Sequence, residues 1–476
     1  MAVPSGIGSC GLGLVGLGVM GQNLALNLGD RGFSVAVFNR TPEKTRQFME
    51  REVSWRDIRP GYTLEEFVVL LRRPRTILIL IAAGPPVNAV IEDLLPLLAP
   101  RDLLIDGGNS HFSDTNYRGR VLTEKGLLFM GLGISGGAKG ARFGPSLMPG
   151  SPPEAYERVR PLLEAIAAQK DGEPCVAYLG KGSVGHYVKM VHNGVEYGLM
   201  QLLAETYDLM KRGLGLTAAD LAAVYADWNQ GPLHSYLVEI TAKIFRHLDE
   251  ATGLPLVELI QDRAGQKGSG MWTTWDAMDL KVPTPNIDVA VAMRDLSGYK
   301  HEREEAAHLL HGPPAQYKGD RGRFVAHLEQ ALYAAMIMTY TQGLALLRRA
   351  SEAYGYNLSL EAVVRVWRGG CIIRAAMLDE LRGAFLAQPG LPNLLLDPGL
   401  SKEVLSRQKS LRKVVGVAAT LGVPAPGFMA ALAYFDAYRS ASLPTNLIQA
   451  QRDFFGAHTY ERVDKPEVFH TEWEDD

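Results

Sequence analysis

The stretch that decides the fold of the first part of this chain is Gly16-Leu17-Gly18-Val19-Met20-Gly21. This G-x-G-x-x-G motif lies between a short apolar run, residues 12–17, and a helical pattern at residues 20–30. In a strand–turn–helix unit the first glycine permits the tight turn, the second lets the backbone approach a pyrophosphate, and the third permits close packing. All six residues are therefore predicted to bind a dinucleotide. The alternative is a glycine-rich turn with a purely structural role.

The residues after the next strand-like run, 33–38, bear on the choice between NAD and NADP. An NAD site usually carries Asp or Glu there, which accepts a hydrogen bond from the ribose 2′-hydroxyl. This chain instead has Asn39-Arg40-Thr41. An amide, a guanidinium and a hydroxyl suit a 2′-phosphate, so the sequence favours NADP. The alternative is that Arg40 is a solvated surface residue.

Apolar runs of strand length alternate with helical stretches over the first part of the chain. After the two runs already described, further ones follow at residues 76–81, 103–105 and 127–130. Short apolar strands separated by helices indicate βαβ units and a parallel sheet that is buried on both faces. We therefore expect an α/β Rossmann-type nucleotide-binding domain over residues 1–183.

Long helical patterns replace the strands after residue 185. The clearest of them cover residues 186–214, 233–249, 327–352 and 413–439. They predict a large all-α domain over residues 184–440. The last stretch, 441–476, has too few apolar residues for a core of its own. We expect it to be a C-terminal tail that is either loose or docked on something else.

Composition excludes several classes of protein. Lys plus Arg is 49 and Asp plus Glu is 52, so a strongly basic surface for nucleic acid or membrane lipid is not expected. The three cysteines, Cys10, Cys175 and Cys371, are far apart and form no C-x-x-C, which argues against a disulfide scaffold and a cysteine zinc site. The N-terminus lacks the pattern of a signal peptide. Residues 331–347 are weakly polar but contain Tyr, Thr and Gln, which favours a buried helix over a membrane span. We expect a cytoplasmic protein.

A run of chemically diverse polar residues lies on one face of the helix predicted at 186–199. At 100° per residue, one arc of about 140° holds His186, Lys189, His192, Asn193, Glu196 and Tyr197. Partial burial would lower the pKa of Lys189 and raise that of Glu196, leaving a base and an acid near neutral pH. The pattern favours an active site between the two domains. The alternative is an amphipathic helix whose polar face lies in water.

Two glycine-containing turns follow predicted strands. Ser135-Gly136-Gly137 comes after the run at 127–130, and Asp106-Gly107-Gly108-Asn109-Ser110 comes after the run at 103–105. At the carboxyl end of a parallel sheet, such turns can offer N–H groups to an anion. Either could also be a plain turn.

With these residues identified, the chain resembles the 6-phosphogluconate dehydrogenase family over essentially its whole length. The matching blocks keep the family's order and spacing: GLVGLGVMGQN at 13–23, FNRT at 38–41, IDGGNS at 105–110, VKMVHNGVEYG at 188–198, DRAGQKGSG at 262–270, WRGGCIIR at 367–374 and LIQAQRDFFGAHTY at 447–460. The resemblance implies NADP-dependent oxidative decarboxylation of 6-phosphogluconate to ribulose 5-phosphate, without a metal. This is a step of the pentose phosphate pathway.

The resemblance also implies roles for individual residues. Lys189 takes the proton from the C3 hydroxyl and later polarises the carbonyl, and Glu196 protonates C1. The substrate would be held by Asn109, Ser135, Gly136, Gly137, His192 and Asn193, and its phosphate by Tyr197, Lys267, Ser269 and Arg294. The coenzyme would also contact Ile81, Ala82, Ala83 and Asn109. In a homodimer, Arg452 and His458 of the tail would complete the partner's site.

The chain departs from the family pattern at two places near the expected site. The family usually has a Glu pair after Ser-Gly-Gly, where this chain has Ala138-Lys139, and it usually has a lysine at the position of Ala82. Rate, coenzyme affinity and the identity of the substrate could change as a result. Two alternatives therefore stay open: a dehydrogenase of another β-hydroxy acid, and a catalytically silent NADP-binding regulatory protein.

Overall fold

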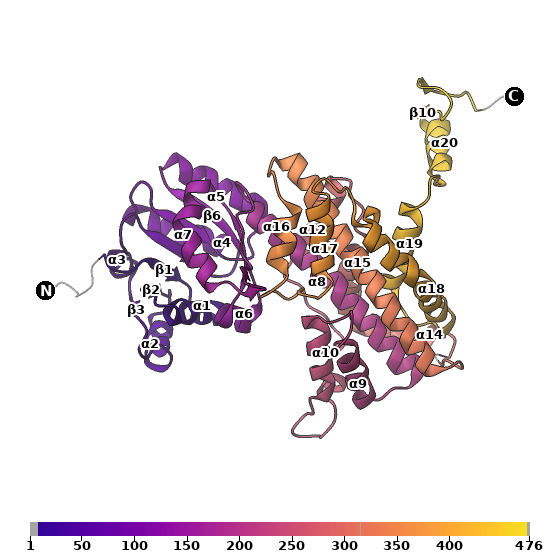
Figure 1. Cartoon of the computed structure of the whole chain (residues 1–476), viewed down its shortest axis with the longest axis horizontal. Coiled ribbons are helices and arrows are strands. Elements are labelled where there is room, and N and C mark those ends of the chain that lie inside the picture. Colours follow the sequence, from indigo (N-terminus) through magenta and orange to yellow (C-terminus); the bar gives the residue numbers. More distant parts are fainter. Residues whose placement is uncertain (1–7, 315, 474–476) are drawn as a thin grey trace.

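The computed structural model describes residues 8–314 and 316–473. It contains an α/β part with the strands and helices of residues 12–174, a helical part with those of residues 184–438, and an arm at the C-terminal end (Figure 1). This is the fold class that the sequence predicts.

A seven-stranded sheet in the order β3-β2-β1-β4-β5-β6-β7 forms the centre of the α/β part. Its strands are β1 (Leu12–Val15), β2 (Val35–Phe38), β3 (Ile58–Pro60), β4 (Thr76–Ile79), β5 (Leu103–Asp106), β6 (Leu128–Ser135) and β7 (Ser146–Gly150). Strands β1 to β6 pair in parallel, but β7 pairs antiparallel with β6. The parallel pairing of the predicted strands is confirmed. The additional strand β7 runs antiparallel, because the link at 136–145 is too short for a parallel crossover.

Helices cover both faces of this sheet. They are α1 (Val19–Asp30), α2 (Pro42–Arg51), α3 (Leu64–Val69), α4 (Pro85–Leu94), α5 (Phe112–Glu124), α6 (Gly137–Phe143) and α7 (Pro153–Ile166). Alternate residues of a strand point to opposite faces. In β1, Leu14 belongs to one buried apolar cluster and Val15 to another. The sheet is therefore buried on both faces, as its continuous apolar strands predict. A small hairpin of β8 (Gln169–Lys170) and β9 (Glu173–Pro174) then leads to the helical part.

The helical part begins with α8 (Val184–Asp208), which continues in a π-helical turn at Leu209–Gly213. Its other helices are α9 (Ala218–Trp228), α10 (Tyr236–Arg246), α11 (Leu256–Leu259), α12 (Ser269–Asp279), α13 (Pro285–Gly298), α14 (Lys300–Leu309), α15 (Arg321–Tyr354), α16 (Leu360–Trp367), α17 (Leu378–Ala387), α18 (Pro398–Leu421) and α19 (Pro426–Tyr438). The pattern at 413–439 is thus divided between two helices, because Pro424 and Pro426 cannot continue α18.

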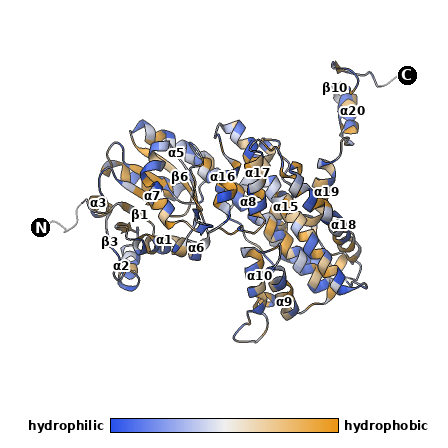
Figure 2. Ribbon diagram, in the orientation of Figure 1, coloured by the Kyte–Doolittle hydropathy of each residue, from blue (hydrophilic) through white to orange (hydrophobic). Residues whose placement is uncertain are grey.

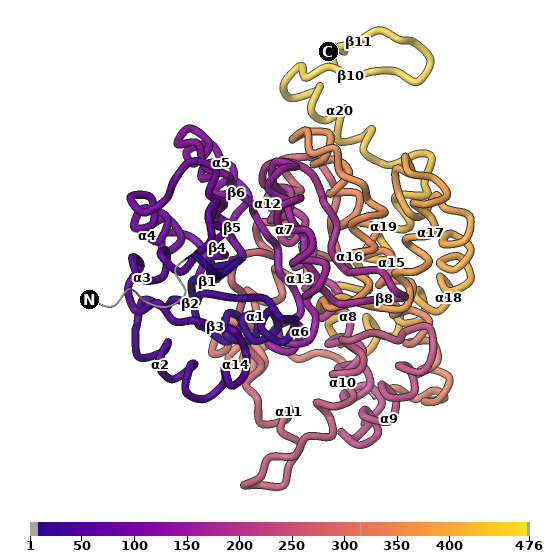
Figure 3. Tube along the Cα trace, turned by 60° about the vertical axis from the view of Figure 1, so that its left-hand side comes forward, coloured from indigo at the N-terminus to yellow at the C-terminus, as the bar shows by residue number. Residues whose placement is uncertain are grey.

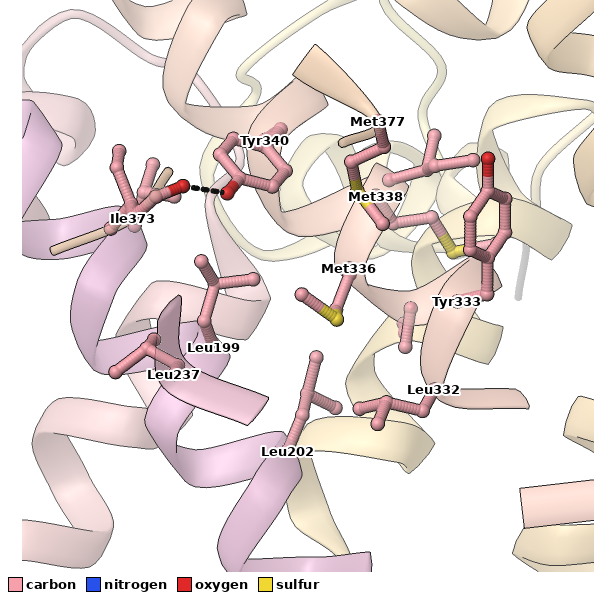
Figure 4. Packing of buried hydrophobic residues seen from close by; sticks show 14 of the residues in the cluster. Leu199, Leu202, Leu237, Leu332, Tyr333, Met336, Met338, Tyr340, Ile373 and Met377 are labelled. Carbon is pink, nitrogen blue, oxygen red and sulfur yellow. Dashed lines mark hydrogen bonds between the residues drawn. The ribbon is translucent and has the colours of Figure 1, made fainter. Parts of the chain in front are cut away.

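Helix α15 forms the centre of the helical part. It has 34 residues, and its buried side chains include Met336, Met338 and Tyr340. Figure 4 shows these residues packed with Leu199 and Leu202 of α8, and the Tyr340 hydroxyl donates a hydrogen bond to the Ile373 carbonyl oxygen at 2.5 Å. The weakly polar stretch at 331–347 lies inside this buried helix, as predicted. Within the described parts of the chain, none of the helices combines the length and the apolar character needed to span a membrane.

The C-terminal arm stands away from the helical part. It consists of α20 (Thr445–Gly456) and a hairpin of β10 (Tyr460–Glu461) and β11 (Val468–Phe469). The tube view in Figure 3 shows the helix and the hairpin beyond the end of α19. In Figure 2, helix α20 carries hydrophobic residues and stands apart from the other helices of the described chain. The prediction that this segment forms no apolar core of its own agrees with the exposure of Leu447, Phe454 and Phe455.

Candidate active site

Helix α8 packs closely against strand β6. Three successive side chains on one face of the helix lie beside three alternate residues of the strand. A Cβ at Gly131 would lie 3.0 Å from His186 Nδ1, and one at Gly133 would lie 2.6 Å from Lys189 Cβ. Ser135 Oγ, at the end of the strand, lies 3.1 Å from His192 Nε2. Glycine at position 133 is therefore needed for the close approach that brings Lys189 and His192 to the carboxyl end of the sheet.

Lys189, His192 and Asn193 form one hydrogen-bonded cluster. Lys189 Nζ donates to Asn193 Oδ1 at 2.7 Å and lies 3.3 Å from His192 Nδ1. Asn193 Nδ2 in turn donates to Oγ of Ser269, the first residue of α12, at 3.0 Å. Lys189 and His192 are both buried. For these two residues the alternative of a polar face in water is wrong, because β6 and the neighbouring helices cover them.

Burial shifts the pKa values of the ionisable groups on this face of α8. It lowers the pKa of Lys189, although the charge of Glu196 acts in the opposite direction. It raises the pKa of Glu196, against the effects of Lys189 and Arg294. It also holds the pKa of His192 well below its usual value, and Lys189 adds to this shift. The lysine is thus made a better base near neutral pH, the glutamate stays protonated to a higher pH, and the imidazole is neutral.

Tyr197 and Arg294 stack on each other further along α8. The guanidinium carbon of Arg294 lies 3.5 Å from the centre of the Tyr197 ring. Arg294 belongs to α13 and also donates to the Gly265 carbonyl oxygen at 3.0 Å. Tyr197 is buried against Ala290 and Val291 of the same helix. This stacking fixes the guanidinium beside the polar face of α8 while leaving part of it accessible.

The glycine motif lies at the carboxyl end of β1, beside the ends of two neighbouring strands. Gly16 has φ +105°, and a Cβ there would lie 2.4 Å from the Leu80 carbonyl oxygen. A Cβ at Gly108, after β5, would lie 3.2 Å from the Ile81 carbonyl oxygen. By contrast, a Cβ at Gly18 would meet nothing within 4 Å. The protein's own packing requires Gly16, whereas Gly18 leaves backbone open on the side where a pyrophosphate would approach.

The residues expected to read the 2′-phosphate follow β2 directly. The backbone N–H of Leu17 donates to Asn39 Oδ1 at 3.1 Å, so this amide ties the end of β2 to the glycine motif. Arg40 and Thr41 are exposed at the start of α2. Lys44 of α2 lines a hollow of about 320 Å³ together with Gly18 and Gln22. Lys44 is not among the residues predicted from the sequence, although its place one turn after Arg40 suggests a second cation for an anionic group.

Several of the predicted site residues do not belong to the hydrogen-bonded cluster around Lys189 in a single chain. Asn109, Lys267 and Ala82 are exposed, as are Ala138 and Lys139 at the start of α6. Arg452 and His458 are exposed on the arm, which projects away from the rest of the chain (Figure 1). For a metal, the residues at 8–314 and 316–473 offer no group of three or more His, Cys, Asp or Glu side chains. Within one chain, the cluster around Lys189 is formed by α8 together with Ser135 at the end of β6 and Ser269 of α12.

Comparison with known proteins covers both parts of the chain. The NAD binding domain of 6-phosphogluconate dehydrogenase matches residues 11–180, and the 6-phosphogluconate dehydrogenase C-terminal domain matches residues 185–473. The decarboxylating 6-phosphogluconate dehydrogenase of Synechococcus elongatus is 53% identical over 464 residues, which is 97% of this chain and 98% of that protein. The NADP(+)-dependent, decarboxylating enzyme of Bacillus subtilis is 50% identical over 463 residues, again 97% of this chain and 98% of the relative.

A solved structure agrees over the same length. The 6-phosphogluconate dehydrogenase of Plasmodium falciparum, determined in its apo form and in complex with NADP+ and with 6-phosphogluconate, has a TM-score of 0.95 and 42% sequence identity to this chain. The match covers 98% of this chain and 100% of the other. Matches to both domains, and identity of this level along the whole length, show that this chain belongs to the 6-phosphogluconate dehydrogenase family.

Proposed function

We infer that this chain catalyses the NADP-dependent oxidative decarboxylation of 6-phosphogluconate to ribulose 5-phosphate. The observation that carries the inference is the buried cluster of Lys189, His192 and Asn193 at the carboxyl end of the sheet. Ligands of open α/β sheets bind at this end. A lysine whose pKa is lowered by burial is also the kind of base that can deprotonate a hydroxyl near neutral pH.

Lys189 acts first as a base and then as an acid. Its neutral amine accepts the proton of the C3 hydroxyl. NADP, which the glycine motif would hold, would supply the acceptor for the hydride that leaves C3. The ammonium of Lys189 then donates a hydrogen bond to the new C3 carbonyl, so that the electrons left by departing carbon dioxide move toward that oxygen. Asn193, which accepts from Lys189 Nζ at 2.7 Å, keeps the amine pointed at this position.

Glu196 acts as the acid that completes the reaction. Its raised pKa keeps the carboxyl group protonated to a higher pH than usual, and the group donates its proton to C1 of the enediol. Lys189 and Glu196 lie two turns apart on one helix, a rise of roughly 10 Å. Their side chains converge on His192, since Lys189 Nζ lies 3.3 Å and Glu196 Oε2 lies 3.8 Å from its Nδ1. The base and the acid can therefore serve neighbouring atoms of one substrate.

The remaining predicted residues bind the two ligands. The sugar acid contacts Asn109, Ser135, Gly136, Gly137, His192 and Asn193, and the phosphate contacts Tyr197, Lys267, Ser269 and Arg294. The coenzyme is held by residues 16–21, 39–41 and 81–83 together with Asn109, and Lys44 adds a charge beside the 2′-phosphate. The cation stacked on Tyr197 supports the phosphate assignment, because guanidinium groups pair well with phosphate oxygens.

The arm is assigned to the neighbouring subunit. Two copies of the chain form a homodimer, in which Arg452 and His458 complete the partner's site. Support comes from the exposed apolar side chains of Leu447, Phe454 and Phe455, which the chain itself leaves uncovered.

We place the domain boundaries at 183/184 and 440/441. We assign the protein to the cytoplasm, because its three cysteines are buried and unpaired.

The test is the initial rate of absorbance rise at 340 nm with 6-phosphogluconate and no added metal. Wild-type protein should give a clear rate with NADP and a lower one with NAD. Lys189→Ala should lose a factor of about 10²–10⁴ or more in kcat, because the base is gone. Lys181→Ala, which removes an exposed lysine just before α8, should keep the full rate.

Near-full turnover by Lys189→Ala would show that another group is the base. A wild-type protein that binds NADP without turnover would favour a different sugar acid or a silent NADP-binding protein. Comparing phosphorylated with unphosphorylated acids separates those two cases. Ala82→Lys and Ala138→Glu would then be the first changes to make, because they restore the family pattern.

A further inference from the structure

The arm contains one buried residue in its helix, and this residue is an aspartate. Asp453 has no exposed surface, whereas its neighbours Arg452 and Phe454 are exposed. A carboxylate without access to water is stable only where hydrogen-bond donors replace the water. The surroundings of Asp453 therefore show what holds the arm together.

Four donors from two other parts of the arm meet the Asp453 carboxylate. Oδ1 accepts from the backbone N–H of Thr459 at 2.8 Å and from His470 Nδ1 at 3.0 Å. Oδ2 accepts from the backbone N–H of Thr471 at 3.0 Å and from Trp473 Nε1 at 2.8 Å. These four bonds use both oxygens fully. One side chain thus joins α20, the turn after it and the end of the hairpin.

The turn held in this way carries His458. Ala457 has φ 47° and Thr459 has φ 61°, so His458 lies between two left-handed residues that are not glycine. A left-handed backbone is strained for residues other than glycine and persists only where the surroundings impose it. The bond from Thr459 to Asp453, together with the bond from Ala457 N–H to the Asp453 carbonyl oxygen at 2.9 Å, imposes this geometry.

We propose that Asp453 is a positioning residue whose carboxylate pre-forms the arm, so that Arg452 and His458 are presented in one fixed arrangement to the active site of the partner subunit. This proposal rests on the proposed function, which assigns those two residues to the partner's site. Pre-formation matters because an arm without an apolar core would otherwise have to order on binding, which costs free energy.

Asp453→Asn is the sharpest variant, since it has the same shape. The Asn side chain offers one oxygen and one NH₂ group, so the NH₂ would face two of the four donors and those two bonds would be lost. The matched control is Asp464→Asn, which removes a carboxylate of the same arm. Asp464 is exposed and pairs with Arg462 at 2.7 Å.

The measurement is the steady-state KM for 6-phosphogluconate and for NADP. Asp453→Asn should raise the KM for 6-phosphogluconate by about tenfold or more, because a displacement of 1 Å in a binding group can cost about 10²-fold. The KM for NADP should not change, and the control variant should match the wild type in both. General loss of folded protein would lower the apparent kcat without this selective change in KM.

A double-mutant cycle decides whether Asp453 acts through its neighbours. Added to the pair Arg452→Ala and His458→Ala, Asp453→Asn should have little further effect, since the groups that it positions are already absent. Additive effects would overturn the positioning role. The positioning role would also be overturned if Asp453→Asn had a normal KM while the protein with Arg452→Ala and His458→Ala was impaired. If Arg452→Ala and His458→Ala are themselves normal, the arm's place in the proposed function fails, and the positioning role fails with it.

Discussion

The helical part and the C-terminal arm each bury a carboxylate, and the two carboxylates respond in opposite ways. Glu205 of α8 accepts from the backbone N–H groups of Gly427 at 2.7 Å and Phe428 at 3.0 Å, at the start of α19. Burial nevertheless raises its pKa to about 7. For Asp453 burial also acts to raise the pKa, but the hydrogen bonds from His470, Trp473, Thr471 and Thr459 outweigh it and lower the value to about 2.

The difference between the two groups comes from the thickness of the protein around them. Glu205 lies among packed helices, so its charge is far from water and desolvation dominates. Asp453 is covered only by the atoms of a thin arm, and water is close on the other side of them. Hydrogen bonds then decide the pKa. The helical part is therefore held together by apolar packing, whereas the arm is held together by a charged group.

The largest effect expected from this comparison concerns Glu196, the other carboxylate of α8 whose pKa burial raises. Glu196→Gln should lower kcat by about 10²–10⁴-fold, since the amide cannot donate the proton. Because the protonated form is the active one, wild-type kcat should fall as pH rises through the raised pKa, and the residual rate of the variant should lose this limb. Glu205→Gln, the same change on the same helix, should keep its kcat. An unchanged kcat for Glu196→Gln would mean that desolvation of this carboxyl group has no catalytic use.

The next effect tests the claim that apolar packing holds only the helical part. Met336→Ala removes a side chain that is 1% exposed in the centre of α15 and should cost about 2–5 kcal/mol of unfolding free energy. Val463→Ala, in the fully exposed loop of the arm, should change it by less than about 0.5 kcal/mol. Thermal unfolding midpoints of the wild type and the two variants measure both changes in stability. Equal shifts for the two variants would remove the distinction between the regions.

The smallest effect is the pH dependence that Glu205 contributes to stability. Its pKa is raised from 4.5 to about 7 on folding, so its stabilising contribution is complete below pH 4.5 and is lost as pH rises through 7. At about 1.4 kcal/mol per pKa unit, the upper limit is about 3 kcal/mol. Unfolding midpoints from pH 5 to pH 8 should therefore fall more for the wild type than for Glu205→Gln. Parallel curves would show that the two backbone donors keep this carboxylate ionised, as the four donors do for Asp453.

Features that depend on local geometry can be predicted from the amino-acid sequence alone. The spacing of Gly16, Gly18 and Gly21 predicts a tight strand–turn–helix unit, because each glycine permits a close backbone approach that a side chain would block. The positions of Lys189, His192 and Glu196 predict one polar face, because residues three, four and seven apart are neighbours on any α-helix. The sequence also predicts the arm as a segment without an apolar core. These inferences need no knowledge of distant contacts.

Which distant groups meet, and how strongly water is excluded from them, depends on the folded structure. It brings Ser135 to His192 and Ser269 to Asn193 across 57 and 76 residues of sequence. It turns β7 antiparallel, and it encloses Asp453 within four donors. The physical reason is that periodicity is a property of neighbours in the chain, whereas desolvation depends on everything packed around a group. The same carboxylate chemistry therefore gives an acid in the helical part and a permanent charge in the arm.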